Sequence, residues 1–576
     1  MATNRRTAKT SGAIKTTRTT AKRPSARKTA KRAAERKPVA TSRVSANVRL
    51  GARVEYRIYP SIGIARVGNS KDGFVEGPEA PGLPTEGPFR GSDGGLKPQA
   101  VRFRIYKVEI DANENEKVTA EIVPDATTKV QWSVDLANRK AAAPRIIETL
   151  ARSANPRLRN PGFDRKKLVI SASAQCTGKN AARKRLTGAI EFAKAGAPSR
   201  GESNIELASV ATDASGRLWV IGGPGKSGSP LNTSADSFAD NDGWYDSVSD
   251  GPVRASLTID GKALDVVPAW VVVTVPRYAP GIYGIVTWYD QAVSMARSND
   301  DGTFSAPKST SFTRDIYPIL KRADALRWVH RTAHGGAGPT ALSDAARLAQ
   351  LMNPAIRSAF VSRLTTLATD AGNPEVIAPN MPKLNSGANP DAGGPTWAHL
   401  SLTRYQHAHM KNWVLDNFDD DWPGAEPAPV PFNKIAIGMQ PRALCEAALE
   451  CCVGGSFYPG IEATYDMARR ETYHPETRLR KEFRVDPRHP SGYLTEKMAL
   501  PWQADFADCS DFWWPSQRPV LVKTAAAQPE RWDRGITGVA RNAHLNMVDF
   551  WPALALVTRD AASGEFVETD RRPFDD

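Results

Sequence analysis

Residues 266–275, VVPAWVVVTV, are a nearly continuous run of apolar and mostly β-branched residues. Such a run is typical of a strand buried on both faces of a sheet. Toward the N-terminus, shorter segments show the alternation or the β-rich composition of further strands. We expect these strands at Val54–Tyr59, Val101–Ile110, Val118–Val123, Leu168–Ser173 and Leu218–Ile221.

Toward the C-terminus the apolar residues recur with helical spacing. This spacing predicts helices over Thr313–Ala333, Ala341–Ala368 and Leu402–Phe418, and a short buried helix over Arg442–Val453 that Gly454-Gly455 ends. The fold class is therefore α+β. We expect one large catalytic body over residues 48–576, β-rich over about 48–310 and helix-rich over about 311–576.

Positive charge is concentrated at the N-terminus. The 576-residue chain has a formal net charge of +15, and residues 1–50 hold fifteen Lys and Arg but a single acid, Glu35. Residues 1–47 lack large apolar side chains, so we expect a disordered tail that either contacts a polyanion or is a solvated appendage. No run approaches the roughly 18 apolar residues of a membrane span. No apolar segment follows Arg5-Arg6, so we expect a cytoplasmic protein or one exported without a cleavable signal.

Several common functional motifs are absent from the sequence. The five cysteines are an odd, sparse set without a CxxC pair, and neither HExxH nor GxSxG occurs. Gly223, Gly225 and Gly228 fit GxGxxG, but a polar loop with a proline follows them instead of a helix. We interpret this segment as a turn, and we expect no metal site.

Residues that could carry chemistry gather near the last cysteine. Five of the fourteen tryptophans fall between Trp502 and Trp551, around the segment Asp505-Phe506-Ala507-Asp508-Cys509. One interpretation is an aromatic core with carboxylates at its rim. The other is a thiol cross-linked to an oxidised indole, which gives a protein-derived quinone that captures amines, with an aspartate as the base.

Further motifs lie in order along the body. They are residues 58–70 (IYPSIGIARVGNS), 241–246 (NDGWYD), 249–252 (SDGP), 402–406 (LTRYQ) and 454–462 (GGSFYPGIE). With the Asp505/Cys509 segment and Trp513-Trp514-Pro515, this set resembles the cysteine tryptophylquinone (CTQ)-dependent amino-acid oxidases, the family of L-lysine ε-oxidase and glycine oxidase. The resemblance covers roughly residues 54–555 and leaves the basic tail without a counterpart.

The resemblance implies a role for individual residues. Cys509 corresponds to the cross-linked thiol, and Asp505 to the aspartate needed for maturation, which is also our candidate for the general base. The candidate tryptophan partners are, in order of preference, Trp551, Trp514, Trp513 and Trp532. The candidate residues of the substrate pocket are Tyr245, Cys452 or its neighbour Cys451, and Glu462. For each of these pocket residues, packing in the core is the alternative role.

The resemblance also implies an activity. We expect oxidative deamination of an amino acid or other primary amine by the CTQ cofactor, with O2 reduced to H2O2 and NH3 released. A flavoprotein maturation partner is implied by the family, and we expect a homo-oligomer. The alternative is a family member without the cofactor that serves as a binding protein, with its tail on a polyanion. The sequence does not distinguish glycine, the α-amine of a larger amino acid and the ε-amine of lysine as substrates.

Overall fold

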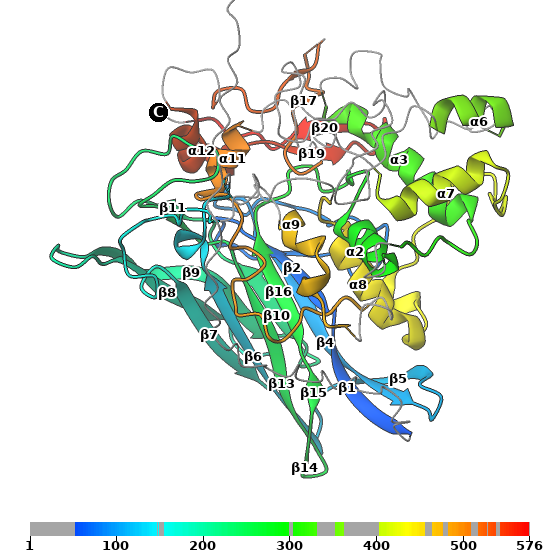
Figure 1. Ribbon diagram of the computed structural model, residues 1–576, viewed down its shortest axis with the longest axis horizontal. Helices are drawn as coiled ribbons and strands as arrows, with labels where there is room; N and C mark the ends of the chain where they lie inside the picture. The colour runs from blue at the N-terminus through cyan, green and yellow to red at the C-terminus, as the bar shows by residue number, and fades with distance from the viewer. Residues whose placement is uncertain are drawn as a thin grey trace, which may run out of the picture. The chain divides into compact units, whose positions relative to one another are not determined.

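The computed structural model describes residues 52–146, 148, 155–298, 303–330, 352–361, 402–454, 463–475, 482–508, 516–526, 528–536 and 542–574. Residues 51–576 belong to one compact unit. Within its described part lies a 14-stranded mixed sheet with the main strand order β7-β6-β13-β16-β2-β4-β10-β9-β8 (Figure 1). These strands are β2 (Ile62–Arg66), β4 (Gln99–Ile110), β6 (Thr128–Asn138), β7 (Ile170–Thr177), β8 (Lys184–Phe192), β9 (Arg200–Thr212), β10 (Leu218–Gly222), β13 (Ser249–Ile259) and β16 (Ala269–Thr274). Beside this path pair β1 (Arg53–Tyr59), β3 (Val75–Glu76), β5 (Glu116–Ile122), β14 (Lys262–Leu264) and β15 (Val266–Val267).

The apolar run 266–275 forms two strands rather than the single one predicted. Pro268 separates β15 from β16, because proline has no N–H to donate to a neighbouring strand. β15 pairs with β1, whereas β16 lies between β13 and β2, with Trp270 opposite Ile62 of β2. Every residue of β16 is buried, as the composition of the run predicts.

The other predicted strands are all present, and the α+β class is confirmed. The predicted helices are confirmed where the structure describes them, as α3 (Tyr317–Ala325), α7 (Arg404–Val414) and α8 (Gln440–Glu450). A π-helical turn precedes α3 at Phe312–Ile316. Of the helix predicted over 341–368, the structure describes residues 352–361, where Met352 and Asn353 form a turn before α6 (Pro354–Val361); the remaining residues lie outside the described part.

Helix α2 (Trp288–Arg297) falls in the region that we expected to be β-rich. It begins with a capping box, in which the Thr287 hydroxyl accepts from the N–H of Asp290 while the Asp290 carboxylate accepts from the N–H of Thr287. This Thr-x-x-Asp signal is visible in the sequence and identifies the start of the helix.

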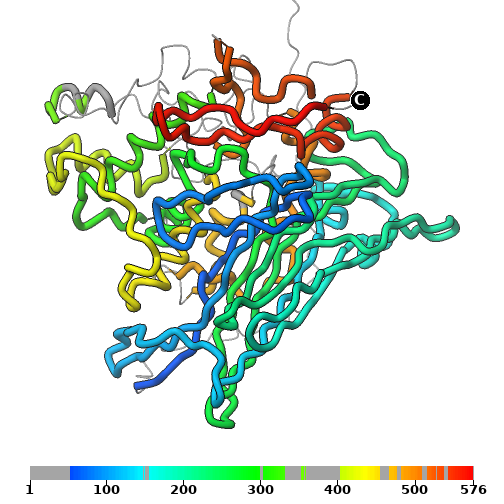
Figure 2. The backbone as a smooth tube through the Cα atoms, turned by 180° about the vertical axis from the view of Figure 1, so that it is seen from behind, coloured from blue at the N-terminus to red at the C-terminus, as the bar shows by residue number. Residues whose placement is uncertain are grey.

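The helices are divided between two places on the sheet. In Figure 1, α2, α3, α7 and α8 gather beside it, while the C-terminal elements gather at one end of its strands. These elements are α11 (Trp502–Asp508), α12 (Ala543–Phe550), β19 (Leu556–Arg559) and β20 (Phe566–Thr569). Figure 2 shows the blue loop between β2 and β4 alongside the red C-terminal strands. There Arg90 donates to the carbonyls of Asp570, Pro552 and Leu554, which joins the two ends of the body.

Candidate functional site

Besides Cys451 and Trp532, four of the candidate site residues lie within the described part of the chain. They are Asp505, Trp551, Tyr245 and Cys452, with 4%, 3%, 2% and 1% of their surface exposed. The structure does not describe Cys509, Trp513, Trp514 or Glu462. The site is therefore built here from the four buried residues and from what holds them.

Asp505 lies in the short helix α11, which begins directly after Pro501. The N–H of Trp502 at the start of this helix donates to Oδ2 of Asp246 over 3.0 Å. A carboxylate at a helix N-terminus satisfies a backbone N–H that has no partner inside the helix, and the helix dipole favours it there. Asp246 therefore holds the start of α11, and with it the turn that carries Asp505.

A buried ion pair holds Asp246 in turn. The Nζ of Lys140 lies 2.7 Å from Asp246 Oδ2, with both side chains fully buried, and also donates to the carbonyl of Ala499 over 2.8 Å. Asn138 Nδ2 donates to Asp246 Oδ1 over 2.8 Å. Burial lowers the pKa of Lys140, while the charges of Asp246 and Asp505 act to raise it. Asp505 therefore lies within electrostatic reach of this buried ammonium group.

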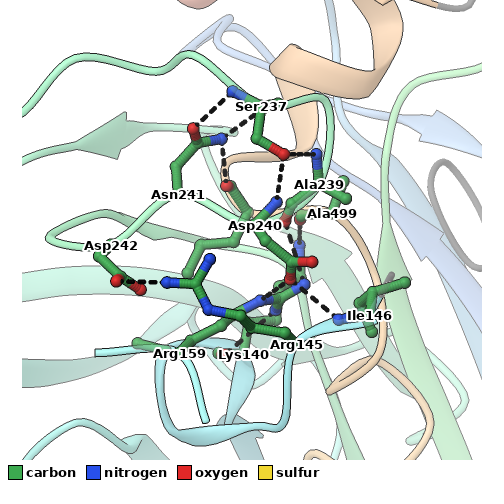
Figure 3. Close-up of polar contacts among 12 residues, drawn as sticks. Lys140, Arg145, Ile146, Arg159, Ser237, Ala239, Asp240, Asn241, Asp242 and Ala499 are labelled. Atoms are coloured by element: carbon green, nitrogen blue, oxygen red, sulfur yellow. Dashed lines mark hydrogen bonds and ion pairs between the residues drawn. The ribbon is translucent and has the colours of Figure 1, made fainter. Parts of the chain in front are cut away.

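A second buried pair, Arg159 with Asp240, lies beside Lys140 (Figure 3). The Nε of Arg159 is 2.7 Å from Asp240 Oδ1, and its Nη2 donates to the carbonyls of Ala239 and Met498, each over 3.0 Å. Removing one member of a buried ion pair leaves the other charge without a partner, so such pairs hold their geometry strongly. Together the two pairs tie residues 138–140, Arg159, residues 239–246 and residues 498–502 into one unit at the start of α11.

Trp551 follows helix α12 and packs against α11. Its ring meets the ring of Trp502 edge to face, with centroids 5.2 Å apart and planes at 69°. Its carbonyl accepts a hydrogen bond from the hydroxyl of Tyr278 over 2.6 Å. Because Trp502 and Asp505 share one short helix, the Trp551 ring and the Asp505 carboxylate belong to the same buried region.

The glycine-rich segment 222–228 closes this region. Gly225 has a φ of +73°, and a β-carbon there would lie 2.6 Å from Cζ2 and 3.0 Å from Cη2 of Trp551. Its carbonyl accepts from Nε1 of Trp502 over 3.4 Å and from Nε2 of Gln503 over 3.2 Å. Only glycine leaves this edge of the indole free of a side chain. The segment is a turn, as expected, but it also forms a wall of the candidate site.

Tyr245 lies at the other end of the same segment. Strand β12 (Tyr245–Asp246) pairs with β11 (Ser227–Gly228), and a β-carbon on Gly228 would lie 3.0 Å from the phenol oxygen. Burial raises the pKa of Tyr245, and nearby Lys226 lowers it. Tyr245 directly precedes Asp246, so the strand that carries the phenol also anchors α11.

Cys452 lies just after α8, where its Sγ accepts from Nη2 of Arg66 over 3.4 Å. The same guanidinium nitrogen donates to the carbonyl of Cys451 over 2.8 Å. Val67, which follows Arg66 in the chain, lies beside Gly225. Its Cγ2 is 3.1 Å from the position that a β-carbon on Gly225 would occupy. Cys452 is therefore linked to the region of Trp551 through the end of β2.

His544 is a site residue that no sequence motif marks. On α12, its Nε2 lies 2.8 Å from Oδ1 of Asp508, and its Nδ1 lies 2.8 Å from the carbonyl of Ala235. The hydrogen bond with Asp508 raises the pKa of His544. The pair joins the C-terminus of α11 to the helix that precedes Trp551. His544 lies two positions after Asn542, which caps the helix, and nothing in the sequence there indicates that Asp508 is its partner.

Trp532, the last of the alternative tryptophans, has the contacts of a core residue. Its Nε1 donates to the carbonyl of Ala555 over 2.7 Å, and its ring meets that of Tyr278 with centroids 4.8 Å apart. The guanidinium of Arg518 lies 5.3 Å from the ring centroid. These partners favour packing over a covalent role for this indole.

Two protein-family models match the chain. The model described as L-lysine ε-oxidase N-terminal matches residues 59–273, which include most of the sheet. The model described as L-lysine ε-oxidase C-terminal domain matches residues 383–526, which include α7, α8 and α11. The chain belongs to the L-lysine ε-oxidase family. It is therefore an oxidoreductase that deaminates an amino acid oxidatively, with O2 reduced to H2O2 and NH3 released.

Individual relatives agree with the family assignment. The chain is 25% identical over 541 residues to the L-lysine 6-oxidase of Marinomonas mediterranea, a match that covers 79% of this chain and 71% of the relative. Its fold is similar to the crystal structure of the Schiff base intermediate of L-Lys ε-oxidase with L-Lys from that organism. That similarity has a TM-score of 0.67 at 22% identity and covers 90% of this chain and 95% of the other. A second structure of the same oxidase matches with a TM-score of 0.67 at 21% identity, over the same shares of the two chains.

The family assignment implies a protein-derived quinone cofactor and does not favour the alternative of a cofactor-less binding protein. Among the described residues, no group of three or more His, Cys, Asp and Glu side chains is placed to hold a metal ion. No helix in that part of the chain is long and apolar enough to cross a membrane.

Proposed function

We propose that Cys509 and Trp551 form the cysteine tryptophylquinone and that Asp505 is the catalytic base. One observation supports the choice of tryptophan: the Cζ2–Cη2 edge of the Trp551 ring faces Gly225, a residue without a side chain. The quinone oxygens need room on two adjacent carbons of the six-membered ring, and a glycine at position 225 keeps a β-carbon away from Cζ2 and Cη2. The missing side chain at position 225 supports Trp551 as the ring that carries the quinone oxygens.

Such a cofactor supplies an electrophilic carbonyl for a primary amine and accepts two electrons from it. Side chains of the protein accept and donate the protons of the reaction. We assign to Asp505 the removal of a proton from the carbon that bears the amine, and its electrostatic interaction with buried Lys140 supports a role for it as a carboxylate. Trp502 and Phe506, both fully buried, exclude water from the helix that carries this carboxylate.

An amino acid with a side-chain amine is our first candidate for the substrate. The support is the name of the curated relative, L-lysine 6-oxidase, and its similarity over 79% of this chain. Glycine and the α-amines of larger amino acids need pockets of other sizes and charges. They are therefore the comparison substrates for an assay of peroxide release.

The test begins with the chain produced together with a flavoprotein maturation partner. We expect visible quinone absorbance, an intact mass that fits an added ortho-quinone and a thioether, and peroxide release with L-lysine. Cys509→Ser and Trp551→Phe are expected to remove all three signals, whereas Trp514→Phe, Trp513→Phe and Trp532→Phe keep them. Loss of absorbance in Trp514→Phe with retention in Trp551→Phe would show that the tryptophan is wrongly assigned.

We also propose that the oxidase is a homo-oligomer, and that it is cytoplasmic or exported without a cleavable signal. Residues 1–47 are proposed to contact a polyanion because they hold most of the net positive charge of the chain. Light scattering tests the assembly, and cell fractionation tests the location. Heparin affinity of the full chain, compared with a chain that begins at residue 48, tests the role of the tail.

A further inference from the structure

A cavity of about 820 Å³ lies among helices α2, α3, α7 and α8, the group seen beside the sheet in Figure 1. None of Asp505, Trp551, Tyr245 and Cys452 lines it. Its volume is within the range of small-molecule sites, roughly 300–1,000 Å³. Charged and aromatic side chains line it, whereas the empty cavities that packing leaves in a core are apolar.

Three carboxylates meet two arginines at the inner end of this cavity. Arg322 of α3 lies 2.8 Å from Asp290 of α2 and 3.0 Å from Glu450 of α8. Glu446, one helical turn before Glu450, lies 3.6 Å from Arg442. The carboxylate side chains are only 13–23% exposed, so water screens their charges poorly. When all five groups are ionised, this end of the cavity has an excess of one negative charge.

The titration of Glu450 reflects this excess. The pKa of Glu450 is raised to about 7, mainly by burial and also by Glu446 and Asp290, against the lowering effect of Arg322 and of a hydrogen bond from the N–H of Gly82. Burial also raises the pKa of Glu446. When both carboxylates are ionised, too little positive charge surrounds them. A cation bound between the two side chains would supply that charge, so its binding would be favourable.

Aromatic rings form the walls of the cavity. They belong to Tyr283, Tyr289, Tyr317 and Tyr405. Tyr283 and Tyr289 lie close enough to Glu450 for its charge to act on their hydroxyl groups. The face of an aromatic ring attracts an ammonium group within about 6 Å of its centroid. The walls therefore suit the same cationic ligand as the carboxylates.

The outer part of the lining has the opposite charge. Arg314 and Lys321 have side chains that are 67% and 50% exposed, and Arg297 and Lys308 lie with them around the cavity. Arg314 is paired with Asp315, and Lys321 with Glu426. The cavity is therefore acidic where it is buried and rich in basic groups where it meets solvent.

We propose that this cavity is a second ligand site, for a basic amino acid. Its side-chain ammonium group would lie between Glu446 and Glu450, and its carboxylate near Arg314 and Lys321. The site is distinct from the residues proposed for catalysis, and binding there does not require the quinone.

The test is isothermal titration calorimetry on the full chain with Cys509→Ser, which cannot form the cofactor. L-Lysine is expected to bind, and L-norleucine, which lacks the ε-ammonium group, to bind at least tenfold more weakly. Glu450→Gln is expected to weaken this binding event at least tenfold. Glu109→Gln is the matched control, because Glu109 is a 46% exposed carboxylate on β4 outside the cavity. We expect it to leave the affinity unchanged.

A second binding event at the catalytic site is recognised because Glu450→Gln does not alter it. Circular dichroism and the thermal-unfolding midpoint check that the variant is folded, and Glu446→Gln is the second variant. Equal affinities of Glu450→Gln and the parent chain, or equal affinities for L-lysine and L-norleucine, would overturn the proposal. Peroxide release by the wild-type chain is a separate measurement, so failure of the oxidase and failure of this site give different results.

The pH dependence adds a further test. With the pKa of Glu450 at about 7, its ionised fraction rises about tenfold from pH 6 to pH 8, and the affinity for L-lysine should rise with it. His409 of α7 also lines the cavity, with its Nδ1 3.0 Å from Thr310 Oγ1 and 3.8 Å from Asp315, and histidine is the residue type that ordinarily changes charge between pH 5 and pH 8. Glu450→Gln separates the two groups, because it should remove most of the pH dependence. A pH dependence that is unchanged in this variant would assign the effect to His409 and contradict the role of Glu450.

Discussion

Replacing Gly225 with alanine is expected to block cofactor formation and to destabilise the chain. The new β-carbon would lie 2.6 Å from Cζ2 and 3.0 Å from Cη2 of Trp551, whereas carbon atoms in contact are about 3.5–4.0 Å apart. The same position has a φ of +73°, a left-handed conformation that costs an L-residue about 1–2 kcal/mol. Overpacking a filled core adds about 1–3 kcal/mol. The expected loss of stability is therefore about 2–5 kcal/mol in total.

A double-mutant cycle separates these two contributions. In a Trp551→Phe chain the smaller ring lacks the Cζ2–Cη2 edge, so only the backbone contribution should remain. Gly225→Ala should then destabilise the Trp551→Phe chain by about 1–3 kcal/mol less than it destabilises the parent chain. Gly73→Ala is the matched control, because Gly73 has a φ of +75° but no atom within 4 Å of its β-carbon position.

Thermal-unfolding midpoints measure the cycle in chains produced without the maturation partner, and visible absorbance after coproduction measures cofactor formation. Gly73→Ala should show only the backbone contribution and full absorbance, whereas Gly225→Ala should lose the absorbance. Equal destabilisation by Gly225→Ala in both backgrounds would refute the contact between this glycine and the indole edge. Full quinone absorbance in Gly225→Ala would refute the proposed placement of the quinone oxygens.

Other substitutions test the groups around α11. Asp505→Ala should abolish both quinone absorbance and turnover, and an Asp505→Ala protein with full cofactor and activity would remove this residue from the mechanism. Lys140→Met leaves Asp246 buried without its cation and should cost about 3–5 kcal/mol of stability. Asp246→Asn added to Lys140→Met should recover part of this loss in thermal unfolding, since it removes the unpaired charge. His544 has a raised pKa through Asp508, so their pairing stabilises the fold below the pKa of the unfolded histidine and is lost as pH rises through the folded pKa. Thermal unfolding of His544→Gln and wild type should therefore differ more at pH 6 than at pH 9, and a difference that is constant with pH would contradict this assignment.

The strands and most helices were predictable because their signals are local. The apolar run around Trp270 is buried on both faces, and its apolar, β-branched composition predicts this burial. The break at Pro268 has an equally local cause, the missing N–H of proline, and could have been read from the sequence. The order of strands was not predictable, because β16 pairs in parallel with β2, and Trp270 lies opposite Ile62 far away in the chain.

The candidate site divides in the same way. Asp505 and Cys509 are four positions apart, so one short motif reveals both. Lys140 and Asp246 are 106 positions apart, and nothing in the sequence around either residue indicates that the other is its partner. Gly225 is a similar case, because local pattern marks a turn but does not show which ring the turn faces. The residues that we propose for the chemistry come from a motif, whereas those that hold the surrounding elements depend on tertiary contacts.

The same reasoning explains why the sequence could not decide between Trp551 and the tryptophans closer to Cys509. Asp508 and His544 are 36 positions apart and yet joined by a hydrogen bond of 2.8 Å. The two ends of the segment between them therefore lie close together. Cys509 directly follows the first of these residues, and Trp551 lies two helical turns beyond the second. The free energy of closing a loop grows only slowly with its length, by about 0.6 kcal/mol for each doubling. A gap of 42 positions is therefore no obstacle to a thioether, and the nearness of Trp513 and Trp514 in sequence gives them an advantage of only about 2 kcal/mol in loop closure.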